Sequence, residues 1–223
     1  MISIAIDGPA GAGKSSIAKT VAKEMGITYV DTGAMYRTMA LSCMRDAVPL
    51  EDEEAVSAHV QEAVIEIRYE NGEQHVLLNG SDVSGEIREE AVGKGASTVA
   101  RYETVRQRLV ELQRELASRQ DVIMDGRDIG TVVLPNAECK IYLTASARVR
   151  ANRRYLELQE KGEICDLDEI ERDIIARDEQ DMNRAVSPLK QAEDAILVDT
   201  SDMSIGEVVA RVKELAEQSR HPS

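Results

Sequence analysis

The sequence predicts an α/β fold, doubly wound around a five-stranded parallel sheet. The first observation is a set of short apolar runs that lack any alternation with polar residues, which is typical of strands buried on both faces. These runs are Ile2–Ile6, Thr28–Val30, Val122–Met124, Ile141–Leu143 and Ile196–Val198. The second observation is the helical spacing between the runs, clearest from Val105 to Leu116, where apolar residues recur at every third or fourth position. Strands that alternate with helices along a chain indicate a parallel sheet covered by helices.

One stretch breaks this rhythm and predicts a hairpin. Apolar and charged residues alternate from Ile65 to Tyr69. Asn71–Gly72 then supplies the two positive φ angles of a type I′ turn, and a returning strand is expected over 74–79. A half-exposed antiparallel hairpin does not belong inside a parallel sheet. We therefore expect a small antiparallel subdomain, about 49–97, inserted into the main fold.

A short polar break, Lys161–Asp166, separates two long helical patterns. It has the size expected of a lid over a nucleotide site, and we predict a lid over about 151–166. The core of a single domain of 223 residues then consists of about 1–48, 98–150 and 167–217.

The composition excludes several partners. A formal net charge of −14 repels nucleic-acid backbones and anionic lipid surfaces. The chain has no Phe and no Trp, so it has few aromatic side chains on which the bases of a single-stranded nucleic acid could stack. We expect small-molecule nucleotides as partners, no nucleic acid and no membrane, and a monomer, because nothing in the sequence demands a dimer.

The expected location is the cytoplasm. No apolar stretch approaches the roughly 18 residues that a membrane span needs, and the chain opens with a strand pattern instead of a signal peptide. Cys43, Cys139 and Cys165 lie far apart and form no CxxC pair, which suits a reducing compartment.

A glycine-rich segment between the first strand and the first helix pattern carries the strongest chemical signal. It has the Walker A spacing of Gly, four residues, Gly, Lys and Ser, and its strand and helix context agrees with that motif. The expected nucleotide-binding residues are Gly8, Pro9, Ala10, Gly11, Ala12, Gly13, Lys14, Ser15 and Ser16. Backbone N–H groups and the helix N-terminus would hold the phosphates of ATP, and Lys14 would reach the β and γ phosphates. The sequence therefore predicts a P-loop phosphotransferase.

Two later loops are predicted to meet this segment at the carboxyl edge of the sheet, where α/β folds bind ligands. The first places the hydroxyl of Thr32 and the guanidinium of Arg37 there. The second follows the third strand with Asp125, Arg127 and Asp128. Ser15 and Asp125 are the predicted Mg²⁺ residues. Either loop alone could be an ordinary turn with a surface salt bridge.

Two groups of arginines flank the predicted lid. They are Arg150, Arg153 and Arg154 on one helix pattern, and Arg177 and Arg184 with Asp181 on the other, where the spacings of four and three predict a shared face. Solvated salt-bridge faces are the alternative interpretation. Five arginines around a lid in so acidic a chain favour phosphate binding, because phosphoryl transfer needs charge stabilisation more than a general base.

Six segments together resemble those of the nucleoside monophosphate kinases, and most closely those of the cytidylate kinase family. They are GPAGAGKSS, DTGAMYR, NGSDVSGEIR, DGRDIGTVVLP, RRYLELQEKG and RDEQDMNRAVSPL. The resemblance runs over nearly the whole chain. It implies transfer of the γ-phosphoryl group of ATP to CMP or dCMP, with Mg²⁺, and an acceptor-binding role for the inserted subdomain.

The resemblance also implies a role for each matching residue. It assigns the acceptor phosphate to Arg37, Arg127 and Arg184, the sugar to Arg177 and Asp181, and the base to Ser97, Arg106 and Asp128, with Thr32 close to the acceptor. Together with the Walker A motif and the arginines around the lid, this predicts a catalytic role for Lys14, Arg127, Arg154 and Arg184, and ATP contacts for Arg150 and Arg154. A carboxylate such as Asp128 suits the exocyclic amine of cytosine, whereas uracil offers a carbonyl oxygen at that position.

Two alternatives remain open at this stage. The nearest is a P-loop kinase of another nucleoside monophosphate or of a small metabolite. The other is a nucleotide-dependent switch, although the NKxD segment that reads guanine in such proteins is absent from the sequence.

Overall fold

The computed structural model describes residues 1–220. By its internal contacts the chain divides into two compact units, which are described separately. The first unit contains Met1–Ile27 and the chain from Asp121 onward, and the second contains Thr28–Gln120. The predicted insertion, 49–97, falls inside the second unit.

The first unit is built on parallel strands whose order follows from their hydrogen bonds. Its strands are β1 (Ser3–Asp7), β6 (Val122–Gly126), β7 (Cys139–Thr144) and β8 (Ile196–Asp199). β1 pairs with β6 on one side and β7 on the other, so that Ile6 lies opposite both Asp125 and Ile141. With β2 (Thr28–Asp31), the complete strand order is β2-β6-β1-β7-β8. The predicted five-stranded parallel sheet is confirmed.

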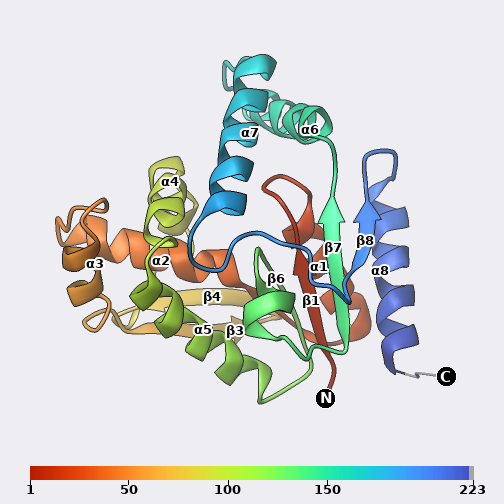
Figure 1. The fold of residues 1–223 in the computed structure, drawn as a ribbon, viewed down its shortest axis with the longest axis horizontal. Helices are drawn as coiled ribbons and strands as arrows, with labels where there is room; N and C mark the ends of the chain where they lie inside the picture. Colours follow the sequence, from red (N-terminus) through yellow and green to blue (C-terminus); the bar gives the residue numbers. More distant parts are fainter. Residues whose placement is uncertain (221–223) are drawn as a thin grey trace. The chain divides into compact units, whose positions relative to one another are not determined.

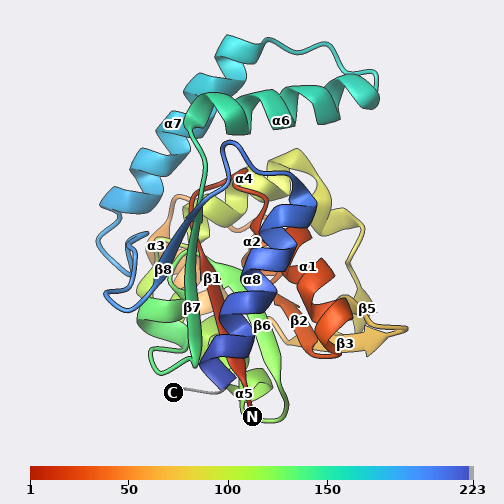
Figure 2. The same cartoon turned by 90° about the vertical axis from the view of Figure 1, so that its right-hand side faces the viewer.

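Helices of the first unit pack on this sheet and extend beyond it. α1 (Lys14–Met25) and α8 (Ile205–Arg220) contact each other, and they contact β6 and β7 respectively (Figure 2). β7 leads from its carboxyl end into α6 (Ala147–Glu160), which packs beside α7 (Leu167–Asn183) (Figure 1). The polar break predicted as part of the lid is the connection between α6 and α7. A short π-helical turn, η2 (Ile129–Val133), follows β6.

The second unit contains the predicted antiparallel element. β3 (Ile65–Glu70) pairs with β4 (Glu73–Leu78), and β4 pairs with the two-residue β5 (Ser81–Asp82). Asn71 and Gly72 have φ angles of 53° and 79°, as a type I′ turn requires. The hairpin prediction is therefore confirmed, and the structure adds a third short strand.

The remaining elements of the second unit are mainly helical. They are α2 (Thr32–Arg45), α3 (Glu53–His59), the 3₁₀ turn η1 (Glu86–Arg88), α4 (Glu90–Val99) and α5 (Glu103–Ala117). α2 and α4 approach closely at Gly95, where an added Cβ would lie 2.8 Å from Leu50 and 3.3 Å from Ala40. Over residues 1–220, no helix combines the length and apolar character needed to cross a lipid bilayer.

Candidate active site

The glycine-rich segment forms a phosphate cradle, residues 8–15, between β1 and α1. Gly11 and Gly13 have φ angles of 73° and 86°, in the left-handed region that favours glycine. Gly8 is required because of a close approach: a Cβ at this position would lie 1.9 Å from the carbonyl oxygen of Leu143. Gly13 is the N-cap of α1 and makes no side-chain cap, so the helix amino end is left for another acceptor.

Lys14 begins α1 and is buried, with 5% of its surface exposed. Its Nζ donates to the carbonyl oxygen of Pro9 at 2.7 Å, so the side chain folds back across the cradle. Burial, and then the positive charge of Arg127, hold the pKa of Lys14 well below its usual range, while Asp125 and Asp7 act in the opposite direction. A bound polyphosphate would stabilise the charged form of this lysine.

Ser15 and Asp125 lie together at the start of α1 and the end of β6. The Ser15 Oγ donates to Asp125 Oδ2 at 2.8 Å, and Asp125 is 5% exposed. Hydroxyl and carboxylate oxygens are ligands that suit Mg²⁺, and this pair fits such an ion. Over residues 1–220, no group of three or more His, Cys, Asp or Glu side chains gathers as a metal site. A Mg²⁺ ion at this pair would complete its shell with water and phosphate oxygens.

Asp7, at the end of β1, joins the cradle strand to the loop after β6. Its two carboxylate oxygens accept the backbone N–H groups of Ile129 and Gly130, each at 2.7 Å. Burial raises the pKa of Asp7 to about 6, partly offset by these two hydrogen bonds. This carboxylate therefore holds the π-helical turn that follows Asp128. Sequence reasoning missed Asp7, which reads as the last residue of a strand.

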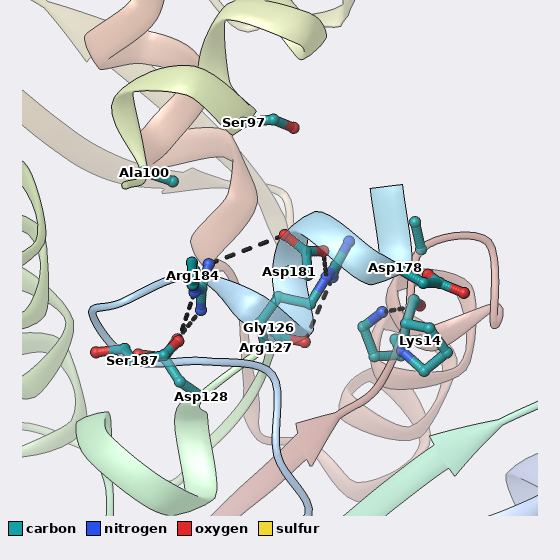
Figure 3. A network of polar contacts seen from close by, with 12 residues as sticks. Lys14, Ser97, Ala100, Gly126, Arg127, Asp128, Asp178, Asp181, Arg184 and Ser187 are labelled. Atoms are coloured by element: carbon teal, nitrogen blue, oxygen red, sulfur yellow. Dashed lines mark hydrogen bonds and ion pairs between the residues drawn. The ribbon is translucent and has the colours of Figure 1, made fainter. Parts of the chain in front are cut away.

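An ion-pair network links that loop to α7 and the residues after it (Figure 3). Asp181 accepts from Arg127 Nε at 2.8 Å, and it lies 4.0 Å from Arg184 Nη1. Arg184 Nη2 lies 3.8 Å from Asp128, and Arg184 Nε donates to the carbonyl oxygen of Ser187. The Arg184 side chain is only 5% exposed. Two arginines and two carboxylates predicted from separate segments are thus brought together within the first unit.

Arg150 forms a second set of contacts, which reaches the cradle itself. Its Nη1 donates to the carbonyl oxygen of Ala10 at 2.8 Å, and its Nη2 donates to Asp178 at 2.6 Å. Its Nε donates to the carbonyl oxygen of Ala145 at 2.9 Å. Asp178 is 8% exposed and was not among the predicted residues. The buried face of α7 therefore carries two carboxylates three positions apart, Asp178 and Asp181.

The other arginines near the predicted lid differ in their surroundings. Arg153 donates to the carbonyl and hydroxyl oxygens of Thr200, which ties α6 to the end of β8. Arg154 is exposed and pairs with Glu157 on the same helix at 3.2 Å. Arg177 is exposed on α7. The expected shared helical face of Arg177, Asp181 and Arg184 is wrong, because α7 ends at Asn183 and Arg184 has extended backbone angles.

In the second unit, Asp31 organises the start of α2. One carboxylate oxygen caps the helix by accepting the Ala34 N–H, and the other accepts from Arg37 Nη2 at 2.8 Å. The side chain of Gln74 binds both the N–H and the carbonyl oxygen of Asp31. Arg37 Nε is buried and has no hydrogen-bond partner within residues 1–220. Thr32 is the first residue of α2 and is 3% exposed.

The predicted base-binding residues of the second unit lie on α4 and α5. Arg106 is 3% exposed, donates to the carbonyl oxygen of Ala100 at 3.2 Å and lies 5.3 Å from the ring centre of Tyr36. This contact has the geometry of a cation–π pair and fixes the guanidinium against α2. Ser97 is partly exposed, and its Oγ lies 3.5 Å from the carbonyl oxygen of Gly93.

The sheet and the cradle together define a P-loop phosphotransferase. A glycine-rich turn leads from a buried strand into a helix that opens with Lys14 and Ser15, and a strand-end carboxylate lies beside the hydroxyl. The family model described as cytidylate kinase matches residues 4–218, and the chain belongs to the cytidylate kinase family.

Sequence similarity to known cytidylate kinases extends over almost the whole chain. The chain is 49% identical over 220 residues to a cytidylate kinase of Lactobacillus gasseri, covering 99% of this chain and 96% of that protein. It is 50% identical over 214 residues to a cytidylate kinase of Desulfitobacterium hafniense, covering 96% and 92%. A gluconokinase structure from Sinorhizobium meliloti shares the fold, with a TM-score of 0.50 and 15% identity over 97% of this chain and 92% of the other.

Proposed function

We propose that this chain transfers the γ-phosphoryl group of ATP to CMP or dCMP, giving ADP and CDP or dCDP. The observation that carries the proposal is its membership of the cytidylate kinase family over residues 4–218. The site chemistry supports it, because the P-loop supplies a site for the phosphoryl donor and the arginines around it supply positive charge for phosphoryl transfer.

On the donor side, we assign the cradle, residues 8–15, together with Ser16, to the phosphates of ATP. Lys14 would leave the carbonyl oxygen of Pro9 and bind the β and γ phosphates, because an anion offers a stronger partner than a carbonyl group. Ser15 and Asp125 would hold Mg²⁺. When bound, that ion neutralises part of the negative charge on the transferred group.

We assign further charge stabilisation to arginines of the first unit. Arg127 and Arg184 are already oriented by Asp181, so they are preorganised before the reaction begins. Arg154 is exposed on α6 and would reach the triphosphate only if the predicted lid, about 151–166, closes. Closure would exclude water, which would otherwise accept the phosphoryl group and hydrolyse ATP.

For the acceptor phosphate, we assign Arg37 together with Arg127 and Arg184. The buried Nε of Arg37, which has no partner within the described part of the chain, is a donor that a phosphate oxygen would satisfy. Thr32, at the start of the same helix, would lie close to the acceptor. The attacking atom is a phosphate oxygen that is already ionised, so no general base is needed.

For the nucleoside, we assign Arg177 and Asp181 to the sugar and Ser97, Arg106 and Asp128 to the base. Asp128 is 4% exposed, and its Oδ1 lies 3.8 Å from Arg184 Nη2. A carboxylate accepts from the exocyclic amine of cytosine but meets another acceptor in uracil. A buried site with such a mismatch rejects the wrong base strongly.

We also expect the enzyme to work as a cytoplasmic monomer, as the sequence predicts. Neither expectation is needed for the reaction, since every assigned residue belongs to one chain.

A panel of acceptors tests the proposed function. The purified protein is incubated with MgATP and each of CMP, dCMP, UMP, AMP, gluconate and shikimate, and ADP release is measured. We expect rapid turnover with CMP or dCMP and much slower turnover with the others. Equal rates with all nucleoside monophosphates would contradict the base assignment, and turnover with a metabolite alone would replace the proposal.

A further inference from the structure

Arg150 donates hydrogen bonds to three segments of the first unit. Its Nε, Nη1 and Nη2 donate to Ala145, Ala10 and Asp178, at 2.9, 2.8 and 2.6 Å. The side chain is 5% exposed. A guanidinium held at each of its three nitrogen atoms is fixed in orientation, whereas a direct phosphate ligand must turn its donors toward the incoming anion.

The contact with Ala10 acts on the backbone of the cradle. The peptide unit that joins Ala10 and Gly11 is planar and trans, so its C=O and N–H groups point in opposite directions. By holding the Ala10 oxygen, Arg150 directs the Gly11 N–H to the side away from itself. The Cβ of Arg150 lies 3.5 Å from the position that a Gly11 Cβ would occupy, so the side chain rests directly against this turn.

Asp178 is the partner that fixes Arg150 from the other side. It projects from α7 and is 8% exposed, and its Oδ2 accepts the Arg150 hydrogen bond. Its other oxygen, Oδ1, is buried and has no hydrogen-bond partner within residues 1–220. Burying a carboxylate with only one of its oxygens hydrogen-bonded lowers the stability of the folded protein. The presence of Asp178 therefore calls for a reason other than stability.

We propose that Asp178 is a positioning residue that acts through Arg150 to orient the Ala10–Gly11 peptide, so that the Gly11 N–H binds a phosphate oxygen of ATP. Asp178 itself does not touch the nucleotide. This inference rests on the proposed function only in requiring that the cradle binds ATP. It modifies the expected role of Arg150, which then contributes to ATP binding through the backbone of the cradle.

The rival interpretation predicts the opposite effect of removing Asp178. In the rival interpretation, Arg150 binds a phosphate directly and Asp178 competes with that phosphate for the guanidinium. Loss of the carboxylate would then free the guanidinium and strengthen ATP binding. If Asp178 positions the cradle, the same change loosens the Ala10–Gly11 peptide and weakens ATP binding. The sign of one measured change therefore separates the two.

The experiment measures the dissociation constant of MgATP by calorimetry in the absence of acceptor, for the wild type, Asp178→Ala, Asp178→Asn, Arg150→Met and the double variant Asp178→Ala with Arg150→Met. The dissociation constant of CMP is measured in parallel. We expect Asp178→Ala and Arg150→Met each to weaken ATP binding about tenfold, the size of one charge-assisted hydrogen bond. Asp178→Asn keeps the shape and one acceptor oxygen, so a smaller loss of about threefold is expected.

The double variant and a matched control sharpen the test. Because Asp178 acts through Arg150, the double variant should bind ATP no more weakly than Arg150→Met alone. Asp168→Asn serves as the control, because Asp168 lies on the same helix but pairs with the exposed Arg148 at 2.6 Å. An exposed pair contributes little, so ATP binding should stay within about twofold of wild type. CMP binding should be unchanged in all variants, which a general loss of structure would not allow.

Two results would overturn the inference. Unchanged or tighter ATP binding in Asp178→Ala and Asp178→Asn would favour Arg150 as a direct ligand. Multiplying losses in the double variant would show that the two residues act separately. If Asp178→Ala does not fold, the dissociation constant of MgATP for Asp178→Asn, relative to that of the wild type, decides alone. Absence of ATP binding by the wild type would refute the donor side of the proposed function as well, whereas normal wild-type binding with unaffected variants refutes this inference only.

Discussion

The hydroxyl of Ser15 donates to the carboxylate of Asp125 at 2.8 Å, although the two residues are 110 positions apart. Parallel pairing of β1 with β6 produces this relationship, because it sets Ile6 opposite Asp125 at the sheet edge where the cradle begins. A pair of oxygen ligands at the end of the phosphate cradle is the feature on which the assignment of Mg²⁺ depends.

Replacing Asp125 should raise the requirement for Mg²⁺. We expect Asp125→Asn to increase the Mg²⁺ concentration for half-maximal activity by about 10–100-fold, the usual effect of altering a residue that supports a metal site. Asp199→Asn is the control, since Asp199 also ends a strand of the parallel sheet, β8, but its carboxylate accepts from the N–H and the hydroxyl of Ser201. A Mg²⁺ titration of ADP release measures both. An unaltered titration curve for Asp125→Asn would remove Asp125 from the metal site.

Replacing Asp128 should weaken discrimination between cytosine and uracil. Asp128→Ala removes the acceptor proposed for the exocyclic amine, so the ratio of kcat/KM for CMP to that for UMP should fall at least about tenfold. Loss of the contact with Arg184 affects both acceptors and cancels in this ratio. Asp181→Ala disturbs Arg127, Arg184 and the proposed sugar contact, which CMP and UMP share, so it should lower both rates and leave the ratio nearly constant. A ratio preserved in Asp128→Ala would show that another residue reads the base.

Replacing Gly8 should destabilise the folded protein. A Cβ at Gly8 would lie 1.9 Å from the carbonyl oxygen of Leu143, and backbone atoms of a central strand cannot move away easily. We expect Gly8→Ala to lower the free energy of unfolding by about 3 kcal/mol or more, measured by urea denaturation. Gly26→Ala is the matched control: its φ is 66° but nothing lies within 4 Å of the added Cβ, so a loss of about 1 kcal/mol is expected. Equal losses in the two variants would contradict the close approach.

Asp7 should titrate well above an ordinary aspartate. Burial raises its pKa from 3.8 to about 6. Because the folded-state pKa exceeds the unfolded value, the folded protein binds this proton more tightly, and the contribution of Asp7 to stability decreases as the pH rises from about 4 to about 6. Carboxyl ¹³C NMR, with Asp7→Asn to assign the resonance, should give a midpoint near 6. A midpoint near 4 would show that its two backbone hydrogen bonds cancel the effect of burial.

Much of this fold is predictable from local patterns. The unbroken apolar runs identify all five strands of the parallel sheet to within about two residues, because a strand buried on both faces has few polar positions. Asn71–Gly72 identifies the hairpin since its backbone conformation is nearly specific to such residues. The Walker A spacing locates the cradle for the same reason: Gly8, Gly11 and Gly13 occupy positions that other residues would strain or fill.

The contacts that organise the site were not predictable in the same way. Asp7 and Asp178 look like ordinary polar residues in the sequence, and only tertiary packing buries them beside backbone amides and Arg150. Arg153 resembles its neighbour Arg154, yet it binds the end of β8 because of its place on α6. The end of α7 before Arg184 also escaped prediction, because neither glycine nor proline follows Asn183 immediately.

Transfer of labelled phosphate tests the central claim most directly. Wild-type protein and Lys14→Met are incubated with ATP labelled at its γ phosphate, Mg²⁺ and CMP, and the products are separated. The wild type should place the label in the β phosphate of CDP with little free phosphate, and Lys14→Met should lose this transfer by a factor of about 10³ or more, as expected when a group that stabilises the transition state is removed. Label in CDP at the wild-type rate from Lys14→Met, or release of free phosphate independent of CMP by the wild type, would contradict the account.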